Sequence, residues 1–206
     1  MHTHAPHPAA PRERELLLIG GGHSHVAVVR AFGMRPLPGL GITLVTRDVH
    51  TPYSGMLPGL VAGHYGFDDC HIDLRPLCEA NGVRLLHAEV EALDPERRTV
   101  RIAGRGTLAY DWASINIGSR PALDAISGAR EHGVGVKPID RFLAHWLALL
   151  EDLAANPRPC RLLVVGGGAA GVEIALALGF RARARLGAHA GLFRVAIANA
   201  APVLLP

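Results

Sequence analysis

Residues 15–25 read ELLLIGGGHSH, and residues 161–173 read RLLVVGGGAAGVE. In both stretches an apolar run ends in three glycines and leads into a segment with helical spacing. Such a run is typical of a buried parallel strand, and the glycines allow a tight turn in which the backbone approaches a pyrophosphate. The unpaired amides at the start of the following helix then attract the negative charge. Each stretch therefore predicts a dinucleotide-binding turn of an α/β fold.

The pattern around each turn predicts a β–α–β unit. The expected elements of the first unit are a strand at 15–19, a helix at 23–32 and a strand at 42–45. Those of the second unit are a strand at 161–165, a helix at 169–181 and a strand at 193–198. A single Rossmann-like domain needs only one such turn, so two of them indicate two dinucleotides.

The chain between the two turns predicts a small β-meander and several helices. Alternating residues favour strands at 83–90, 99–102 and 112–117, with a turn at residues 94–96. Residues 51–65 predict a loop leading into a short helix. Residues 72–81 predict a helix that ends at Gly82, and residues 141–153 predict a helix capped by Asp140.

The domain organisation follows from one break in this pattern. Residues 156–159 are polar and contain proline, which makes them the expected boundary between two domains. We therefore expect a His- and Pro-rich tail at 1–13, a first Rossmann-like domain with a meander at 14–156, and the first β–α–β unit of a second, truncated Rossmann-like domain at 157–206.

Composition argues against several other classes of protein. The net charge is +3 and the arginines are scattered, so no nucleic-acid partner is expected. No apolar stretch is long enough to predict a membrane span. The three cysteines include no CxxC pair, which favours a reducing, cytoplasmic location. His2, His4 and His7 are expected in a solvated tail, and no metal site is predicted from the spacing of the other histidines.

The motifs resemble those of the two-dinucleotide-binding flavoprotein family, which includes the pyridine nucleotide-disulfide reductases and the type II NADH dehydrogenases. The segments GGGHSHV, HTPYSGMLPGLVAGHY, CHIDLRPLC, SINIGSRP and VKPIDRF are, more narrowly, similar to the flavoprotein module that is fused to selenide, water dikinase. The resemblance implies FAD at the first glycine turn and NAD(P)H at the second. It implies an oxidoreductase that passes hydride from NAD(P)H to FAD and then electrons to a small-molecule or quinone acceptor.

The resemblance also implies roles for individual residues. Those expected to bind FAD are Gly20, Gly22, His23 and His25 at the pyrophosphate, Ser54, Gly55 and Met56 near the flavin ring, Val90 at the adenine, and Ile117, Gly118 and Ser119 in a closing loop. Those expected to cradle the NAD(P)H pyrophosphate are Gly166, Gly168, Ala169 and Gly171. Glu173 matches the acid that lies beside the flavin and nicotinamide, and is the candidate catalytic residue; the alternative is a solvated helix carboxylate.

Several positions depart from the family pattern. His25 replaces the third glycine of the first turn, which weakens the motif and leaves a glycine-rich turn without a ligand as an alternative. Thr46 and Asn199 stand where an acid usually binds ribose hydroxyls, and we expect Asn199 to bind the ribose and to discriminate weakly between NADH and NADPH.

The end of the chain leaves two further alternatives open. We expect residue 206 to precede the family's later Gly-Asp segment, which grips the flavin, so the chain alone is expected to hold FAD weakly. It would then be an inactive nucleotide-binding fragment. Alternatively, the intact polypeptide is a bifunctional selenide, water dikinase of which this chain is the flavoprotein part.

Overall fold

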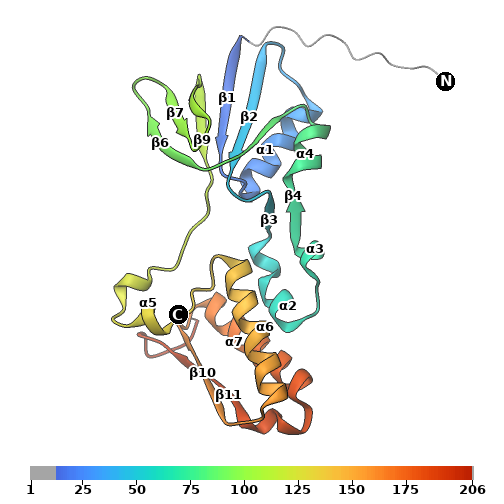
Figure 1. The fold of residues 1–206 in the computed structure, drawn as a ribbon, viewed down its shortest axis with the longest axis vertical. Coiled ribbons are helices and arrows are strands. Elements are labelled where there is room, and N and C mark those ends of the chain that lie inside the picture. The colour runs from blue at the N-terminus through green and yellow to red at the C-terminus, as the bar shows by residue number, and fades with distance from the viewer. Residues whose placement is uncertain (1–12, 206) are drawn as a thin grey trace, which may run out of the picture. The chain divides into compact units, whose positions relative to one another are not determined.

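The computed structural model describes residues 13–205. Of the tail expected at 1–13, only Glu13 is described, and His2, His4 and His7 lie outside the described residues. The described chain divides into two compact units. Unit 1 contains the segment that ends at Thr51 and the segment Ile72–Gly118, whereas unit 2 contains Pro52–His71 and the chain from Ser119 onward. The chain therefore passes between the units three times (Figure 1).

Unit 1 is built on a parallel sheet with the strand order β5-β2-β1-β9. The strands are β1 (Arg14–Ile19), β2 (Leu40–Thr46), β5 (Arg84–His87) and β9 (Trp112–Ile115). Helices α1 (His23–Met34) and α4 (Leu74–Ala80) lie together beside this sheet (Figure 1), and their apolar side chains share a core with Leu18 and Leu44. The arrangement confirms the predicted Rossmann-like α/β class.

An antiparallel sheet, β6-β7-β8, packs on the other face of the parallel sheet. Its strands are β6 (Val90–Asp94), β7 (Thr99–Ile102) and β8 (Gly106–Ala109). Side chains alternate between the faces of a strand, so Leu17 and Ile19 of β1 point away from Leu18 and meet Val100 and Ile102 of β7. This sheet is the predicted meander. Its middle strand β7 confirms the strand expected at 99–102, whereas the two outer strands differ from the expected ones.

The strand predicted at 83–90 is wrong, because it is two strands in two sheets. β5 pairs with β2 as far as His87, and the Ala88 amide then donates to the Thr46 carbonyl at 3.0 Å. Beyond that bond the chain leaves the parallel sheet and begins β6. The strand predicted at 112–117 ends at Ile115 and joins the parallel sheet rather than the meander, whose third strand is β8.

Two short strands replace parts of the loop and helix expected between residues 51 and 81. They are β3 (His50–Pro52) and β4 (His71–Asp73), which pair with each other. The helix predicted at 72–81 therefore begins only at Leu74, where the Asp73 carboxylate accepts a hydrogen bond from the Arg75 amide at 2.9 Å. The expected stop is confirmed, since the chain takes a left-handed conformation at Gly82 with φ 65°.

Unit 2 consists of a short parallel ribbon and several helices, which cover one face of the ribbon (Figure 1). Its main elements are α2 (Leu57–Ala62), α3 (Phe67–Cys70), α5 (Ala129–His132), α6 (Ile139–Ala155), β10 (Cys160–Val165), α7 (Ala169–Leu186) and β11 (Phe193–Ala198). Helices α2, α6 and α7 share one apolar core, in which the Trp146 indole donates to the Val61 carbonyl at 3.3 Å.

The break at 156–159 joins elements of a single core. Helix α6 before the break and helix α7 after it both belong to unit 2 and pack against each other. Because a compact unit and a cofactor-binding domain are defined differently, the domains at 14–156 and 157–206 stay a prediction. Asp140 is not the cap of α6: the cap position is Pro138, and Asp140 lies in the first helical turn, where its charge favours the helix start.

The close contact between the end of β10 and the start of α7 depends on one glycine, Gly171. The Gly166 amide donates to the Ala198 carbonyl at 2.8 Å, and Gly166 has φ 115°. A Cβ atom added at Gly171 would lie only 1.9 Å from the Gly166 carbonyl oxygen, whereas a Cβ at Gly168 would meet nothing within 4 Å. The absence of a side chain at Gly171 is therefore what lets α7 approach the strand end.

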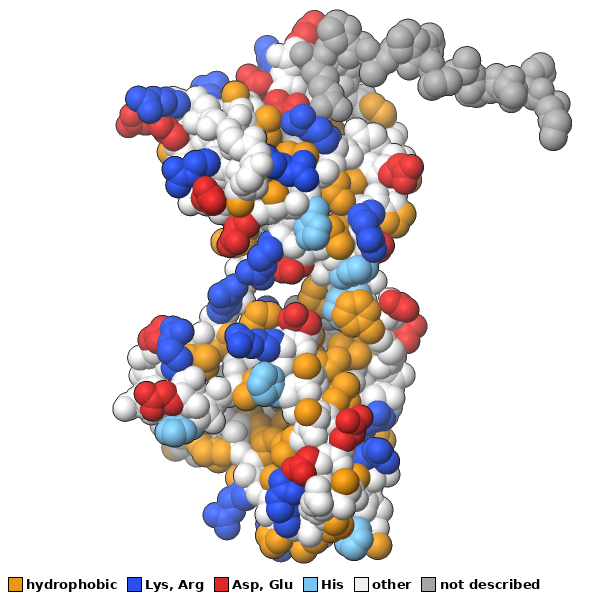
Figure 2. Space-filling model, viewed as in Figure 1, with side chains coloured by type: hydrophobic (Ala, Val, Ile, Leu, Met, Phe, Trp, Pro, Cys, Tyr) orange, Lys and Arg blue, Asp and Glu red, His pale blue; other side chains and the backbone are white. Residues whose placement is uncertain are grey.

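The surface carries charges of both signs. Figure 2 shows Lys and Arg side chains interspersed with Asp and Glu on the face in view. No helix between residues 13 and 205 is both long and apolar enough to cross a bilayer. Within the same range, no three metal-ligating side chains come together.

The cysteine thiols differ in accessibility. Cys70 and Cys78 are buried, and Cys160 is partly exposed. Burial raises the pKa of Cys78 to about 11, and burial together with the nearby Asp69 charge raises the pKa of Cys70. Because the thiolate is the reactive form, we expect these two thiols to react slowly near neutral pH.

The loop glycines provide a matched test of the β10–α7 joint. Gly171→Ala should lower the free energy of unfolding by about 1–3 kcal/mol, because the methyl group must displace the Gly166 carbonyl. Gly168→Ala should change it by less than about 1 kcal/mol, since Gly168 has open space and an extended backbone. Urea denaturation of both variants measures the difference, and equal losses would show that the close approach is not what α7 requires.

The buried thiols make a second prediction. In the folded protein at about pH 7.5, only Cys160 should react rapidly with Ellman's reagent, because a thiolate is needed for attack. Cys70 and Cys78 should react after unfolding in guanidinium. The variant Cys160→Ser should lose the fast phase and keep the slow one. Rapid reaction of more than one thiol in the folded state would contradict this assignment.

Candidate functional site

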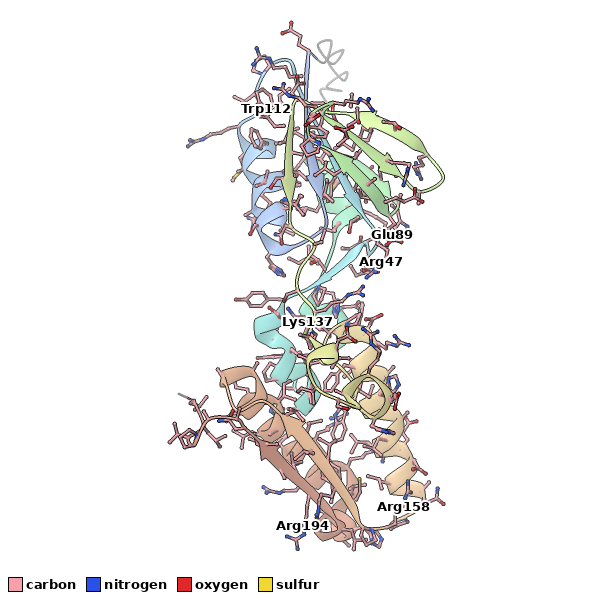
Figure 3. All side chains as sticks on the ribbon, turned by 90° about the vertical axis from the view of Figure 1, so that its left-hand side faces the viewer. Arg47, Glu89, Trp112, Lys137, Arg158 and Arg194 are labelled. Atoms are coloured by element: carbon pink, nitrogen blue, oxygen red, sulfur yellow. The ribbon has the colours of Figure 1, made fainter. Side chains whose placement is uncertain are left out.

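The first glycine loop lies at the carboxyl end of β1, between β2 and β9. Trp112 marks the amino end of this sheet, and Arg47 and Glu89, which follow β2 and β5, mark its carboxyl end (Figure 3). The strand order reverses at β1, because the next strand along the chain adds on one side and β9 adds on the other. Such a switch point at the carboxyl ends of parallel strands is where α/β folds bind ligands.

Gly20 is held on both sides by backbone. Its amide donates to the Val45 carbonyl at 2.7 Å, and its φ is 91°. A Cβ atom at this position would lie 2.3 Å from the Asn116 carbonyl oxygen. The predicted requirement for glycine at the first position of the turn thus has a concrete cause, which is the close approach of the chain that follows β9.

Asn116 is a site residue that the sequence reasoning missed. Its carbonyl accepts the Gly22 amide at 3.2 Å, and a Cβ at Gly22 would lie 2.3 Å from its side-chain oxygen. The amide group of Asn116 therefore lies directly against the loop. The available signal was its place immediately after β9, since residues that follow neighbouring parallel strands meet at one edge of the sheet.

His25 is buried beneath the loop, with only 1% of its surface exposed. Its Nδ1 lies 2.6 Å from the Gly20 carbonyl oxygen and its Nε2 lies 2.9 Å from the Ser114 hydroxyl. Burial lowers the pKa of the imidazole, although the bond to Gly20 acts in the opposite direction. The expectation that His25 faces the pyrophosphate is not supported by this position, because both ring nitrogens are engaged inside unit 1.

The other residues expected near FAD are divided between the units. His23 begins α1, Val90 begins β6 and packs on the core between the two sheets, and Ile117 and Gly118 follow β9. Ser54, Gly55, Met56 and Ser119 belong to unit 2, where Ser54–Met56 form a 3-10 turn leading into α2. Their contacts with a cofactor stay a prediction.

Thr46 occupies the position of the missing acid at the end of β2. Its hydroxyl donates to the Asp48 carbonyl at 2.9 Å, and the side chain is buried. The Thr46 hydroxyl oxygen also lies 3.2 Å from where a Cβ at Gly21 would be, so this side chain packs against the loop. This position contributes no negative charge to the site.

The second glycine loop lies at the carboxyl end of β10 in unit 2. Gly168 precedes α7 and Ala169 is its first residue, so the loop meets a helix start as predicted. The open space around Gly166 and Gly168 leaves backbone accessible to a ligand, in contrast to Gly171, which is in contact with the Gly166 carbonyl.

Asn199 closes this loop through hydrogen bonds within the protein. Its Oδ1 accepts the Gly167 amide at 3.1 Å, and its Nδ2 donates to the carbonyls of Ala201 and Val203 at 3.0 and 2.7 Å. The Leu205 amide donates to the Gly167 carbonyl at 2.9 Å. Both donors of the Asn199 amide are thus used, so a ribose hydroxyl finds only the Oδ1 lone pair.

The charged candidates lie along α7. Glu173 is exposed on the second turn of the helix, which fits both a solvated carboxylate and the predicted role beside a cofactor. Arg181 is 12 residues beyond Ala169, about 18 Å along the helix, and its guanidinium lies against Gly63. The arginines at 181, 183 and 185 therefore do not reach the second glycine loop.

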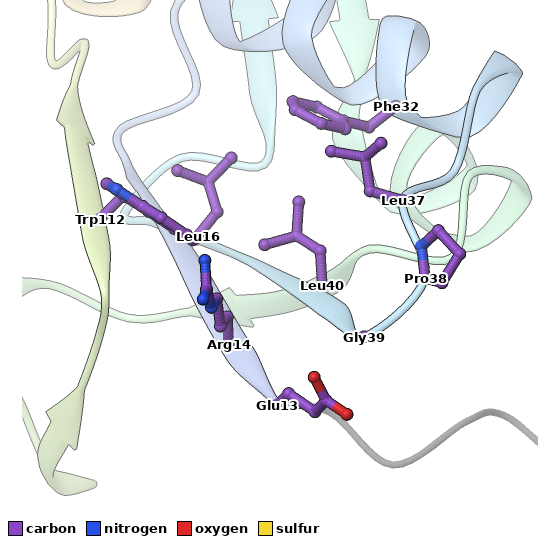
Figure 4. Close-up of a pocket in the computed structure, with 9 residues that line it drawn as sticks. All are labelled: Glu13, Arg14, Leu16, Phe32, Leu37, Pro38, Gly39, Leu40 and Trp112. Atoms are coloured by element: carbon purple, nitrogen blue, oxygen red, sulfur yellow. The ribbon is translucent and has the colours of Figure 1, made fainter.

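A cavity of about 470 Å³ in unit 1 lies away from the glycine loop (Figure 4). It is lined by residues at the amino ends of β1, β2 and β9, including Arg14, Leu16, Leu40 and Trp112. The Arg14 guanidinium sits 5.6 Å from the centroid of a Trp112 ring. Because α/β sheets bind ligands at the opposite edge, this cavity is not the candidate site.

Comparison with known proteins identifies relatives of the chain. It is 28% identical over 165 residues to the NADH-dependent phenylglyoxylate dehydrogenase subunit epsilon of Aromatoleum evansii, covering 77% of this chain and 37% of the relative. It is 32% identical over 111 residues to the demethylphylloquinone reductase of Synechocystis sp., covering 51% and 27%. The chain thus spans well under half the length of these curated relatives.

A solved structure and a family match agree with the fold. The sulfide:quinone oxidoreductase of Aquifex aeolicus superimposes with a TM-score of 0.66 at 24% identity, over 84% of this chain and 40% of that protein. Residues 14–206 match the family described as pyridine nucleotide-disulphide oxidoreductase. With both glycine loops and nearly all of the described residues inside this match, the chain belongs to the pyridine nucleotide-disulphide oxidoreductase family.

Proposed function

We propose that this chain is the cofactor-binding part of an FAD-dependent NAD(P)H oxidoreductase, with FAD at the first glycine loop and NAD(P)H at the second. The observation that carries the proposal is the pair of strand–glycine–helix turns, one in each unit, each at the carboxyl end of a parallel strand. When bound, the flavin accepts hydride from the nicotinamide and passes electrons onward. The chain's own residues bind and orient the two dinucleotides.

The first loop fits a pyrophosphate. A side chain at position 20 or 22 would collide with Asn116, so only bare backbone forms this part of the turn. The first amides of α1 add the positive end of a helix dipole. Val90 begins β6, and Ile117 and Gly118 follow β9 of the same unit; these three residues are proposed to meet the adenine half of FAD.

The second loop fits a second pyrophosphate for a different reason, which is the open space beside its glycines. Gly166 and Gly168 have no neighbouring atom within 4 Å of where a side chain would begin, and α7 starts at Ala169. We assign Gly166, Gly168 and Ala169 to NAD(P)H. Glu173, one helical turn further on, is the candidate for a carboxylate beside the nicotinamide, and Ser54, Gly55 and Met56 are the candidates for contact with the flavin ring.

The electron acceptor is proposed only as a class. One relative is a demethylphylloquinone reductase and the similar structure is a sulfide:quinone oxidoreductase, which supports a quinone, with another small molecule as the alternative. The link to selenide, water dikinase rests on the sequence motifs alone. The low net charge and the scattered arginines favour a protein that binds dinucleotides over one that binds nucleic acid. The cysteine content supports a cytoplasmic location.

Two variants of the intact protein test whether the first loop binds FAD and the second binds NAD(P)H. Gly22→Ala should lower the flavin content of the purified protein, because the methyl group collides with Asn116; adding Asn116→Ala should restore it. Gly168→Asp, which has room for a side chain, should retain flavin but raise the KM for NADH at least about tenfold through repulsion of the pyrophosphate. Visible spectra and steady-state rates with an artificial acceptor measure both effects.

The same experiment separates the alternatives. An intact protein that binds flavin but is not bleached by NADH or NADPH under anaerobic conditions would instead be a regulatory nucleotide-binding module. An intact protein that binds neither dinucleotide would overturn the proposed function. Retention of NADH affinity in Gly168→Asp would show that the second loop does not hold the pyrophosphate.

The contacts of Asn199 predict weak discrimination between the two nicotinamide cofactors. The kcat/KM values for NADH and NADPH should differ by less than about tenfold, since Asn199 stands where an acid usually binds the ribose and the arginines of α7 do not reach the second loop. Asn199→Asp should lower the ratio of NADPH to NADH activity, because a carboxylate repels the 2′-phosphate. Asn199→Ala is the control: it should lower both activities and leave the ratio unchanged. A strong preference of the native protein would contradict this prediction.

A further inference from the structure

His25 occupies the position that Gly171 holds in the second loop, the sixth residue of the turn in each case. In both loops this residue meets the carbonyl of the first glycine. The Cα of Gly171 packs so closely on the Gly166 carbonyl that a Cβ would be 1.9 Å from its oxygen. His25 instead reaches the Gly20 carbonyl with Nδ1, at 2.6 Å. One chain therefore forms the same joint once by direct packing and once through an imidazole.

The hydrogen bonds of His25 fix its tautomer. A carbonyl oxygen only accepts, so Nδ1 must carry the hydrogen that points to Gly20. The neutral ring, which burial favours, then has an unprotonated Nε2 that accepts from the Ser114 hydroxyl at 2.9 Å. Ser114 lies on β9, so the ring joins the loop at the end of β1 to the neighbouring strand.

The bond to Gly20 also determines the direction of the next amide. The Gly20 carbonyl and the Gly21 N–H belong to one planar trans peptide and point in opposite directions. When the Gly20 carbonyl points to His25, the Gly21 N–H is turned away from His25. This amide makes no hydrogen bond within the described residues, whereas the Gly20 and Gly22 amides are used by Val45 and Asn116.

We propose that His25 is a positioning residue that aims the Gly21 amide at the pyrophosphate of FAD. The proposal rests on the proposed function, because it assumes that the first loop holds this cofactor. His25 does not touch the pyrophosphate itself. It replaces the third glycine of the motif with a side chain that satisfies the Gly20 carbonyl and sets the orientation of the peptide between Gly20 and Gly21.

Three substitutions at one position test this role in the intact protein. His25→Asn keeps a donor at the place of Nδ1, His25→Leu keeps comparable volume without a donor, and His25→Gly restores the usual three-glycine motif. We expect the dissociation constant for FAD to rise at least about tenfold in the Leu and Gly variants and less than about threefold in the Asn variant. Ser114→Ala should have an effect between these two.

A second measurement separates positioning from folding. The 15N-resolved amide resonance of Gly21 should shift when ADP is added to the flavin-free native protein and to His25→Asn, but not to His25→Leu. Thermal unfolding of each variant is recorded alongside. If His25→Gly binds FAD as tightly as the native protein, or if all three variants lose affinity in proportion to their loss of stability, the proposal is overturned. If the native protein binds neither FAD nor ADP, the proposed function fails first.

Discussion

The fold depends on how closely the end of a parallel strand can approach the start of the helix that follows it. In both units a few residues connect the strand to the helix. Within this turn the carbonyl of the first glycine, Gly20 or Gly166, points towards the helix. The sixth residue of the turn must contact this carbonyl closely. A carbonyl left without a partner, or a side chain that collides with it, would push the helix away from the sheet. The meander of unit 1 and the helices of unit 2 pack against the strands and helices that these turns connect.

The elements that were predicted correctly are those whose pattern is local. β1, β2, β10 and β11 are mainly apolar, and α1 and α7 begin directly after glycines, so each is specified by its own residues. The strand at 83–90 could not be divided from sequence, because the division is set by the point at which Thr46 stops pairing. β3 and β4 are three residues each, too short for alternation to be visible.

The candidate site shows the same division between local and non-local information. The turn motif alone predicts that positions 20, 22, 166 and 171 require glycine. The structure shows the atoms that exclude a side chain at positions 20, 22 and 171. The burial of His25, the contact of Asn116 with the loop and the internal hydrogen bonds of Asn199 were not predictable. Each depends on a partner brought close by the fold: Ser114 for His25, Gly22 for Asn116, and the chain beyond β11 for Asn199.

The interrupted course of the chain through the two units affects the order in which the protein can fold on the ribosome. The apolar side chains of α2 emerge early, but the helices that bury them follow much later: Val61 and its partner Trp146 are 85 residues apart. At roughly 5–20 residues per second, this separation amounts to about 4–17 s of translation. Throughout that interval Leu57, Leu60 and Val61 lack their partners on α6 and α7, so this segment is where a nascent chain would need protection by a chaperone.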